Sequence, residues 1–176
     1  MPLLPQLSAQ ATVLDVFELS PEFTPPLMEY HQLLLRGPSS FSVAERELIA
    51  AYVSGLNACG FCHGAHTAVA ASFGISQNQL DQMMQNLDES GIDEKIIPVL
   101  RYVEKLTRLP SKLTQADADA VYAAGWDEEA LNHAIHVCAL FNFMNRLVEG
   151  HGISPMPAQA NQQMAQMLHD KGYEGL

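Results

Sequence analysis

The feature that most constrains the fold is a long apolar segment, which extends from Glu128 to Glu149. Large apolar side chains recur along it at helical spacing and would cover most of a helix circumference: Val137, Leu140, Phe141, Phe143, Met144 and Leu147. A helix that is apolar on nearly every side has to be covered by other elements. The segment therefore predicts a central buried helix around which the rest of the chain packs.

Helices are also predicted in the rest of the chain, from the same spacing and from residues that cap helix ends. Ser42 with Glu45 and Ser76 with Gln79 form capping boxes, and Thr114 caps a later segment. We predict helices over approximately these residues: 13–19, 26–35, 43–56, 59–73, 77–87, 94–108, 115–124, 128–149 and 158–170. Because no segment alternates in the manner of a half-buried strand, the predicted fold class is all-α.

Length and composition favour one domain with a sizeable core, because the chain has 176 residues and no shift in composition along it. Residues 1–25 contain four prolines and predict an N-terminal arm of the kind that often packs on a neighbouring subunit. Residues 26–152 form the predicted helical core, and residues 153–176 form a C-terminal loop and helix. In that last helix, Met164 and Met167 belong to a stripe typical of core or subunit contacts.

The charge of the chain limits its partners. It has 9 basic and 20 acidic residues, a formal net charge of -11, which repels phosphate backbones and anionic lipids. We therefore expect no nucleic-acid partner and no membrane partner. The N-terminus lacks a positively charged region followed by an unbroken apolar run, and no stretch reaches the roughly 20 apolar residues that span a bilayer. These features predict a cytoplasmic protein.

The stretch ELIAAYVSGLNACGFCHGAH, from Glu47 to His66, carries the residues with the clearest chemistry. Cys59, Cys62 and His66 are spaced so that they lie on one face of a helix. If the chain reverses near Asn57, Glu47 and His66 each lie ~14 Å along a helix from the turn and meet across a helical hairpin. Three cysteines are too few for a disulfide framework, and in a reducing compartment a close pair is typical of catalysis or metal binding.

The predicted arrangement would activate a thiol. The carboxylate of Glu47 would orient the imidazole of His66, which would take a proton from a cysteine. The helix N-terminus favours a thiolate at Cys59, whereas the neighbouring imidazole favours one at Cys62, so the identity of the attacking cysteine stays open. Peroxide reduction suits such a pair: one thiolate becomes a sulfenic acid, the second thiol condenses with it to a disulfide, and an external thiol restores the pair.

The C-G-F-C motif, with the glutamate before it and the histidine after it, resembles the alkylhydroperoxidase AhpD-like family of the carboxymuconolactone decarboxylase superfamily. The match is strongest over about residues 44–74, and the later segment FNFMNRLVEGHG resembles the asparagine-containing helix of peroxidase-related members. The resemblance implies an AhpD-like helical domain built around a hairpin that carries C-x-x-C. It also implies an antioxidant peroxidase or disulfide reductase without metal, haem or other cofactor, and homo-oligomers such as dimers, trimers or hexamers.

Carried over position by position, the resemblance implies that Cys59 and Cys62 are the redox pair. It implies that Glu47 and His66 are the proton relay. One departure lies just before the second cysteine, where well-known members carry histidine and this chain has Phe61, with a histidine after the cysteine instead. We expect supporting positions around the thiols for four further residues: His63, Tyr52, Asn142 and Asn145. No role is assigned to His133, His136 or His151, and Cys138 is expected to pack in the core.

Three alternatives remain. The string from Cys59 to His63 is also a C-x-x-C-H haem-attachment sequence, although covalent attachment usually requires export and Glu47 would then have no role. A zinc site could use both cysteines with His63 and His66, although one helix presents tetrahedral ligands poorly. The cysteines could also be buried small residues in a non-enzymatic helical module that binds another protein.

The preferred interpretation is a cytoplasmic, homo-oligomeric oxidoreductase. It would be a thiol-dependent peroxidase or disulfide oxidoreductase that reduces a hydroperoxide substrate through its C-x-x-C pair. A thiol or dithiol would be the reductant.

Overall fold

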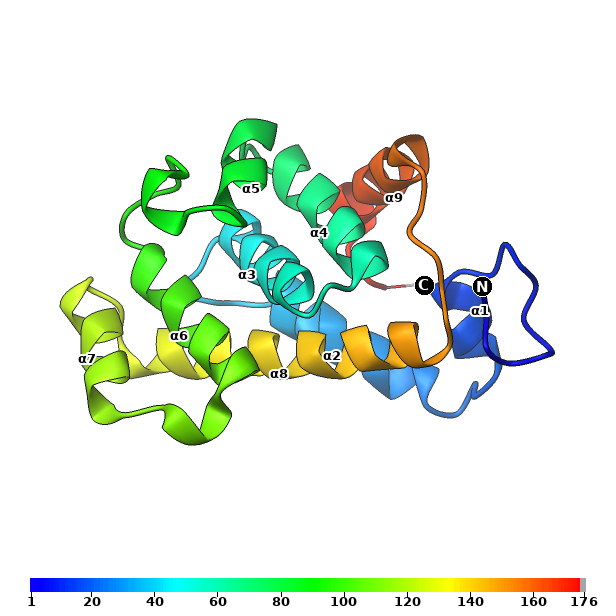
Figure 1. Cartoon of the computed structure of the whole chain (residues 1–176), viewed down its shortest axis with the longest axis horizontal. Coiled ribbons are helices and arrows are strands. Elements are labelled where there is room, and N and C mark those ends of the chain that lie inside the picture. The colour runs from blue at the N-terminus through cyan, green and yellow to red at the C-terminus, as the bar shows by residue number, and fades with distance from the viewer. Residues whose placement is uncertain (175–176) are drawn as a thin grey trace.

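The computed structural model describes residues 1–174, and over these residues every regular element is a helix (Figure 1). The α-helices are α1 (Val13–Glu18), α2 (Thr24–Arg36), α3 (Val43–Leu56), α4 (Gly60–Ser72), α5 (Gln77–Met83), α6 (Ile97–Arg108), α7 (Gln115–Ala123), α8 (Glu128–Gly150) and α9 (Ala158–Lys171). Two short 3-10 turns, η1 (Leu87–Glu89) and η2 (Pro110–Lys112), flank α6. The predicted all-α class is confirmed.

The core lies between α8 and the two helices α3 and α4. α8 runs along the length of the molecule, and Figure 1 shows α3 and α4 side by side above it, with α9 on the outer side of α4. α6 contacts both α3 and α8, and α7 packs against α6 and α8 at one end. α8 buries most of its apolar side chains, but Phe143 is 52% exposed, so one face of this helix is open to solvent in the single chain.

The helix starts follow the predicted capping chemistry. At α3, the Ser42 hydroxyl accepts from the backbone N–H of Glu45, and the Glu45 carboxylate accepts from the backbone N–H of Ser42. The same reciprocal pair begins α5 at Ser76. These bonds satisfy backbone N–H groups that have no partner inside the helix.

Two predicted boundaries are wrong. α5 ends at Met83 rather than near Leu87, because the chain leaves the helix and makes the η1 turn. α6 begins at Ile97 rather than at Glu94, and the residues before it form turns instead. The reason is Pro98 in the first turn of α6, since a proline has no N–H to bond a carbonyl one turn earlier.

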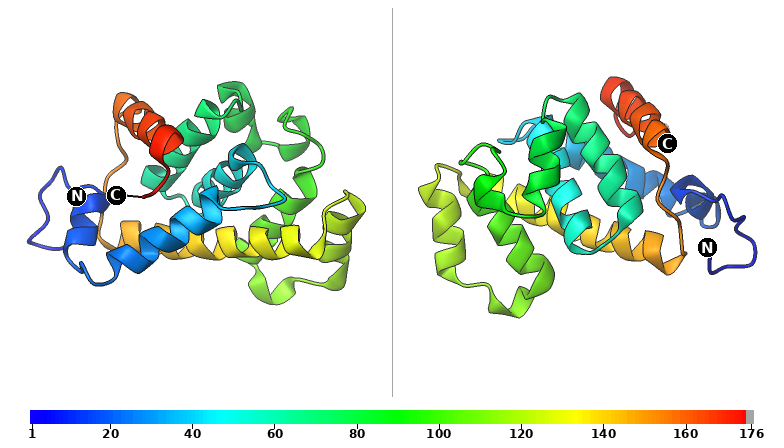
Figure 2. Two further views of the ribbon diagram at one scale, coloured as in Figure 1. Left: turned by 180° about the vertical axis from the view of Figure 1, so that it is seen from behind. Right: turned by 45° about the horizontal axis from the view of Figure 1, so that its top comes forward.

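The N-terminal segment and α9 lie towards the same end of the molecule, as the two views of Figure 2 show. The N-terminal segment is tied to the end of α8 by a bond from the Leu3 N–H to the His151 carbonyl, 2.9 Å. α1 buries Val13 and Phe17 in the core of its own chain. After α9, the backbone N–H of Tyr173 donates to the side chain of Gln32 on α2, 2.8 Å.

Within residues 1–174, no helix combines the length and the apolar character needed to cross a membrane.

Candidate functional site

The turn between α3 and α4 places the two cysteines. Asn57 ends α3, and Ala58 adopts a positive φ of 55°, which turns the chain sharply. The Cys59 N–H then bonds back to the Ser54 carbonyl, 3.0 Å, and Cys59 itself is the N-cap of α4. Cys62 follows in the first turn of α4, and both cysteines are buried free thiols.

Glu47 and His66 are in direct contact across α3 and α4. The His66 Nδ1 atom lies 2.7 Å from Glu47 Oε2, and the Glu47 side chain is completely buried. Because the carboxylate can only accept, this bond assigns the proton to Nδ1 and leaves Nε2 free to accept one. The His66 ring is held from the side by Phe141, edge to face at 4.4 Å between centroids.

The other carboxylate oxygen of Glu47 has two partners that the sequence did not reveal. Arg36 Nη1 donates to Oε1 at 2.6 Å, and the Tyr173 hydroxyl donates to it at 3.0 Å. Burial by itself would raise the pKa of Glu47, but the hydrogen bonds and charges of His66 and Arg36 outweigh it, so the pKa is lowered. Glu47 is therefore an ionised carboxylate at neutral pH.

One signal could have pointed to Arg36. A buried carboxylate requires a cation or several donors, and Arg36 is the basic residue in the last turn of α2. Nothing in the local pattern points to Tyr173, which lies far away in the chain.

The two thiols have opposite proton affinities. A hydrogen bond from the Cys62 thiol, helped by the Cys62 backbone N–H, lowers the pKa of Cys59 despite its burial. Its role as donor in this bond, together with burial, raises the pKa of Cys62. Negative charge therefore collects first on Cys59 at the helix N-terminus, while Cys62 keeps its proton.

In residues 1–174, a small cavity lies beside the thiol pair. It has a volume of about 60 Å³ and is lined by Cys62 and His66 together with mainly apolar side chains, including Phe61, Phe141 and Met144. Cys59 is not among its lining residues. A small molecule in this cavity would meet the Cys62 sulfur and the His66 ring together.

Asn142 and Asn145 hold the turn before the cysteines. The Asn57 amide donates to Asn145 Oδ1 at 2.9 Å and to Asn142 Oδ1 at 3.1 Å, and Asn145 also donates to Ser54. The hydrogen bond with Cys59 and burial raise the pKa of Cys62, and a hydrogen bond from Asn145 lowers it by a smaller amount. Asn142 instead bonds to Cys138 and Thr107, away from the thiol pair.

His63 and Tyr52 lie outside the cavity that contains Cys62. The His63 Nδ1 atom lies 2.9 Å from the Ala51 carbonyl, so this ring contacts the backbone of α3. The Tyr52 hydroxyl donates to Glu104 on α6 at 3.0 Å and lines a separate pocket with Arg101. Burial and the Glu104 charge raise the pKa of Tyr52. Neither residue lines the cavity that contains Cys62.

The three unassigned histidines contact neither cysteine in the described residues. His133 lies against the Leu34 carbonyl, His136 against the Tyr30 hydroxyl and His151 against the Leu147 carbonyl. Residues 1–174 also contain no group of three or more His, Cys, Asp or Glu side chains arranged to hold a metal ion. His63 and His66 turn their Nδ1 atoms to Ala51 and Glu47, respectively.

Comparison with known proteins gives one family match. Residues 21–104 match the model of the carboxymuconolactone decarboxylase family. This range includes the whole α3–α4 pair with its cysteines. No curated protein matches the chain significantly.

Solved structures share the fold at low sequence identity. An uncharacterized peroxidase-related protein from Silicibacter sp. TM1040 has a TM-score of 0.78 and 24% identity, over 86% of this chain and 79% of that one. The alkylhydroperoxidase AhpD core of an uncharacterized peroxidase-related protein from Ralstonia eutropha JMP134 has a TM-score of 0.79 and 22% identity, over 88% and 80% of the two chains.

A third structure is a protein of unknown function from Agrobacterium tumefaciens, named for AhpD-type antioxidant defence. Its TM-score is 0.69 and its identity 17%, over 84% of this chain and 99% of that one. The family match over residues 21–104 and the common fold together support an AhpD-like member of the carboxymuconolactone decarboxylase superfamily.

Proposed function

We propose that the chain is a thiol-dependent peroxidase, in which Cys62 attacks a hydroperoxide and Cys59 then closes a disulfide with it. One observation carries this proposal: a single small cavity is lined by the Cys62 thiol and by His66, whose other nitrogen is bound to the ionised carboxylate of Glu47. A thiol beside an oriented imidazole is the arrangement that activates a weak nucleophile. The peroxidase-related proteins with the same fold support this choice.

The first step needs a thiolate at Cys62. Its proton passes to the free nitrogen of His66, whose ring becomes an imidazolium held by the Glu47 carboxylate. The Cys62 sulfur then attacks the terminal oxygen of the hydroperoxide, so that a sulfur–oxygen bond forms while the oxygen–oxygen bond breaks. The imidazolium of His66 gives its proton to the departing alkoxide, which leaves as an alcohol.

The second step uses the neighbouring thiol. Cys59 attacks the sulfur of the Cys62 sulfenic acid, a disulfide forms, and the oxygen leaves as water with one proton. A cytoplasmic thiol or dithiol then reduces the disulfide by exchange and is itself oxidised. We further propose that the chain acts as a homo-oligomer, without nucleic-acid or membrane partners.

The test is hydroperoxide consumption with dithiothreitol as the reductant. Cys59→Ser and Cys62→Ser should reduce turnover to background, and His66→Ala should reduce it by about 10²-fold or more, because it removes the proton acceptor and donor. Cys138→Ser is the matched control, since this buried thiol lies away from the cavity and should keep parental turnover. Full activity in both cysteine variants would overturn the proposal.

The order of attack is tested separately with a sulfenic-acid trap such as dimedone. After one equivalent of hydroperoxide, Cys59→Ser should carry the adduct on Cys62, because no thiol remains to condense with it. Cys62→Ser should carry none. An adduct on Cys59 in the Cys62→Ser protein would contradict the assignment of Cys62 as the attacking residue.

A further inference from the structure

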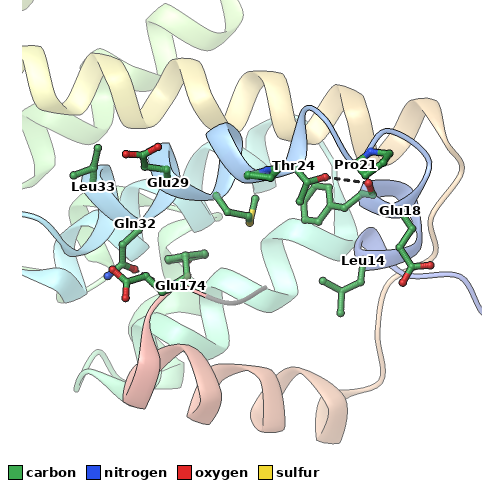
Figure 3. Close-up of a pocket in the computed structure, with 12 residues that line it drawn as sticks. Leu14, Glu18, Pro21, Thr24, Glu29, Gln32, Leu33 and Glu174 are labelled. Carbon is green, nitrogen blue, oxygen red and sulfur yellow. Dashed lines mark hydrogen bonds between the residues drawn. The ribbon is translucent and has the colours of Figure 1, made fainter.

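An open groove lies between α1, α2 and the segment after α9. It has a volume of about 800 Å³, and Figure 3 shows Leu14 and Glu18 of α1 towards one end of it and Glu29 and Leu33 of α2 towards the other. Its walls are mostly apolar, and Leu33 is 62% exposed. The groove is far larger than the cavity that contains the Cys62 thiol.

The groove and the cavity are neighbours that share a wall. Four residues line both of them: Leu14, Phe17, Met28 and Tyr173. Two of them, Leu14 and Met28, have flexible side chains that can change rotamer without a change in the backbone. The groove is therefore an outer chamber of the proposed peroxidase site.

The size of the cavity limits what can enter it. At about 60 Å³ the cavity is much smaller than the groove, which has about 800 Å³ by the same measure. The peroxide oxygens must reach the Cys62 sulfur inside this space. The organic part of any larger hydroperoxide has to remain in the outer groove, against Leu14 and Leu33.

The groove carries charge of one sign. Its lining includes the acidic residues Glu18, Glu29 and Glu174, and among residues 1–174 no lysine, arginine or histidine lines it. Figure 3 shows Glu18 towards one end and Glu29 with Glu174 towards the other, so a ligand along the groove passes between them. These exposed carboxylates repel an anionic ligand and slow its association, and salt screens the repulsion.

We propose that this groove binds the organic part of the hydroperoxide, and that its acidic rim selects uncharged hydroperoxides over those that bear a carboxylate. The proposal rests on the peroxidase function and adds the site and the charge preference of the substrate. The acidic residues that set this preference lie in α1, in α2 and after α9, outside the cysteine motif.

The experiment compares cumene hydroperoxide with its para-carboxy derivative, which carries one added carboxylate. With dithiothreitol at low salt, the parent should show a kcat/KM for the uncharged compound about tenfold higher than for the anion. The ratio should fall towards one in about 0.5 M sodium chloride, because salt screens the repulsion. Because both kcat/KM values are measured on the same protein, their ratio is unaffected by a change that lowers activity towards both substrates equally.

The variant Glu18→Gln/Glu29→Gln should lower this ratio several-fold. Its matched control is Glu89→Gln/Glu94→Gln, which removes the same charge at exposed positions between α5 and α6, away from the groove (Figure 1). The control should keep the parental ratio. Hydrogen peroxide, which has no organic part, is assayed with every protein as the measure of the underlying peroxidase activity.

The possible failures are distinct. Turnover of hydrogen peroxide without any charge preference, or with a preference that persists in Glu18→Gln/Glu29→Gln, would overturn the groove assignment alone. The groove would then have another occupant, such as a second copy of the chain. No turnover of any of the three peroxides would overturn the peroxidase function, and the groove assignment with it.

Discussion

At the scale of single residues, the site depends on the buried charge of Glu47. Removing a carboxylate from water costs several kcal/mol, and only a close cation with further hydrogen bonds offsets that cost. The cation and the hydrogen bonds come from three separate parts of the chain: Arg36, His66 and Tyr173. The pKa of Glu47 stays low as a result, and the carboxylate keeps the proton of His66 on Nδ1.

Replacing Arg36 by methionine should therefore destabilise the protein strongly. The change leaves Glu47 buried without its cation, and breaking a buried pair in this way costs about 3–5 kcal/mol. Urea denaturation at pH 7 measures the loss. The control is Arg101→Met, because Arg101 and Asp88 form a pair whose side chains are 55% and 65% exposed.

The control variant should lose no more than about 1 kcal/mol, since water and salt screen exposed pairs. Equal losses in the two variants would contradict the expectation that the buried Arg36–Glu47 pair contributes more to stability than the exposed Arg101–Asp88 pair. Hydroperoxide turnover should also fall in Arg36→Met, because the carboxylate loses a partner that keeps it ionised.

At the scale of secondary structure, the turn between α3 and α4 positions the chemistry. It places Cys59 at the N-cap of α4, where the first N–H groups of the helix stabilise a thiolate. Asn142 and Asn145 of α8 accept hydrogen bonds from the Asn57 side chain in this turn. The central helix therefore fixes the position of the turn that carries the cysteines. The sharp reversal needs a positive φ at Ala58, a conformation that most L-residues adopt only at a cost.

Ala58→Val should test this turn. A β-branched residue at positive φ is strained, and we expect a loss of about 1–2 kcal/mol in the free energy of unfolding. Ala58→Asn is the control, because asparagine tolerates this conformation and should cost little. Ala58 is exposed, so neither change fills the core. Equal stability of the two variants in thermal denaturation would show that the turn relaxes without cost.

At the scale of the whole molecule, the two ends of the chain complete the site. α1 and Tyr173 contribute to the wall of the cavity. Both are hydrogen-bonded to α2, since the Thr24 hydroxyl donates to the Phe17 carbonyl of α1 and the Tyr173 N–H donates to Gln32. His31 of α2 lies beneath them, buried beside Tyr173 and Phe141. Burial lowers the pKa of His31 to about 4, and this outweighs its hydrogen bond with the Leu27 carbonyl.

His31 should make the packing of these segments sensitive to acid. Its pKa is lower in the folded protein than the usual 6.5, so its contribution to stability is complete above pH 6.5 and is lost as the pH falls towards 4. Between pH 7 and 4.5 this residue alone should account for roughly 2–3 kcal/mol. Urea denaturation of the parent and of His31→Phe at both values measures it.

The His31→Phe protein should lose less stability on acidification than the parent by that amount. The same substitution at His136, which is exposed, should leave the loss unchanged. A parental loss in His31→Phe would place the acid sensitivity in other groups, such as Glu47 with its lowered pKa.

Much of the fold could be predicted because helical spacing and capping are local properties. Ser42 with Glu45, and Asp127 at the start of α8, set helix starts through bonds within four residues. The boundaries of α5 and α6 were wrong where a turn or a proline interrupted the same spacing. The expected contact of Glu47 with His66 also came from local geometry, since both lie at similar distances from one turn.

The sequence by itself determined the helices, the spacing of Cys59, Cys62 and His66 on one helical face, and the acidic character of the chain. Only the tertiary structure decided which thiol meets the cavity, which cation neutralises the buried carboxylate, and which surfaces form the outer groove. Arg36 and Tyr173 approach Glu47 from positions 11 and 126 residues away in the chain. Contacts of that kind depend on how whole helices pack, and no local pattern of residues encodes them.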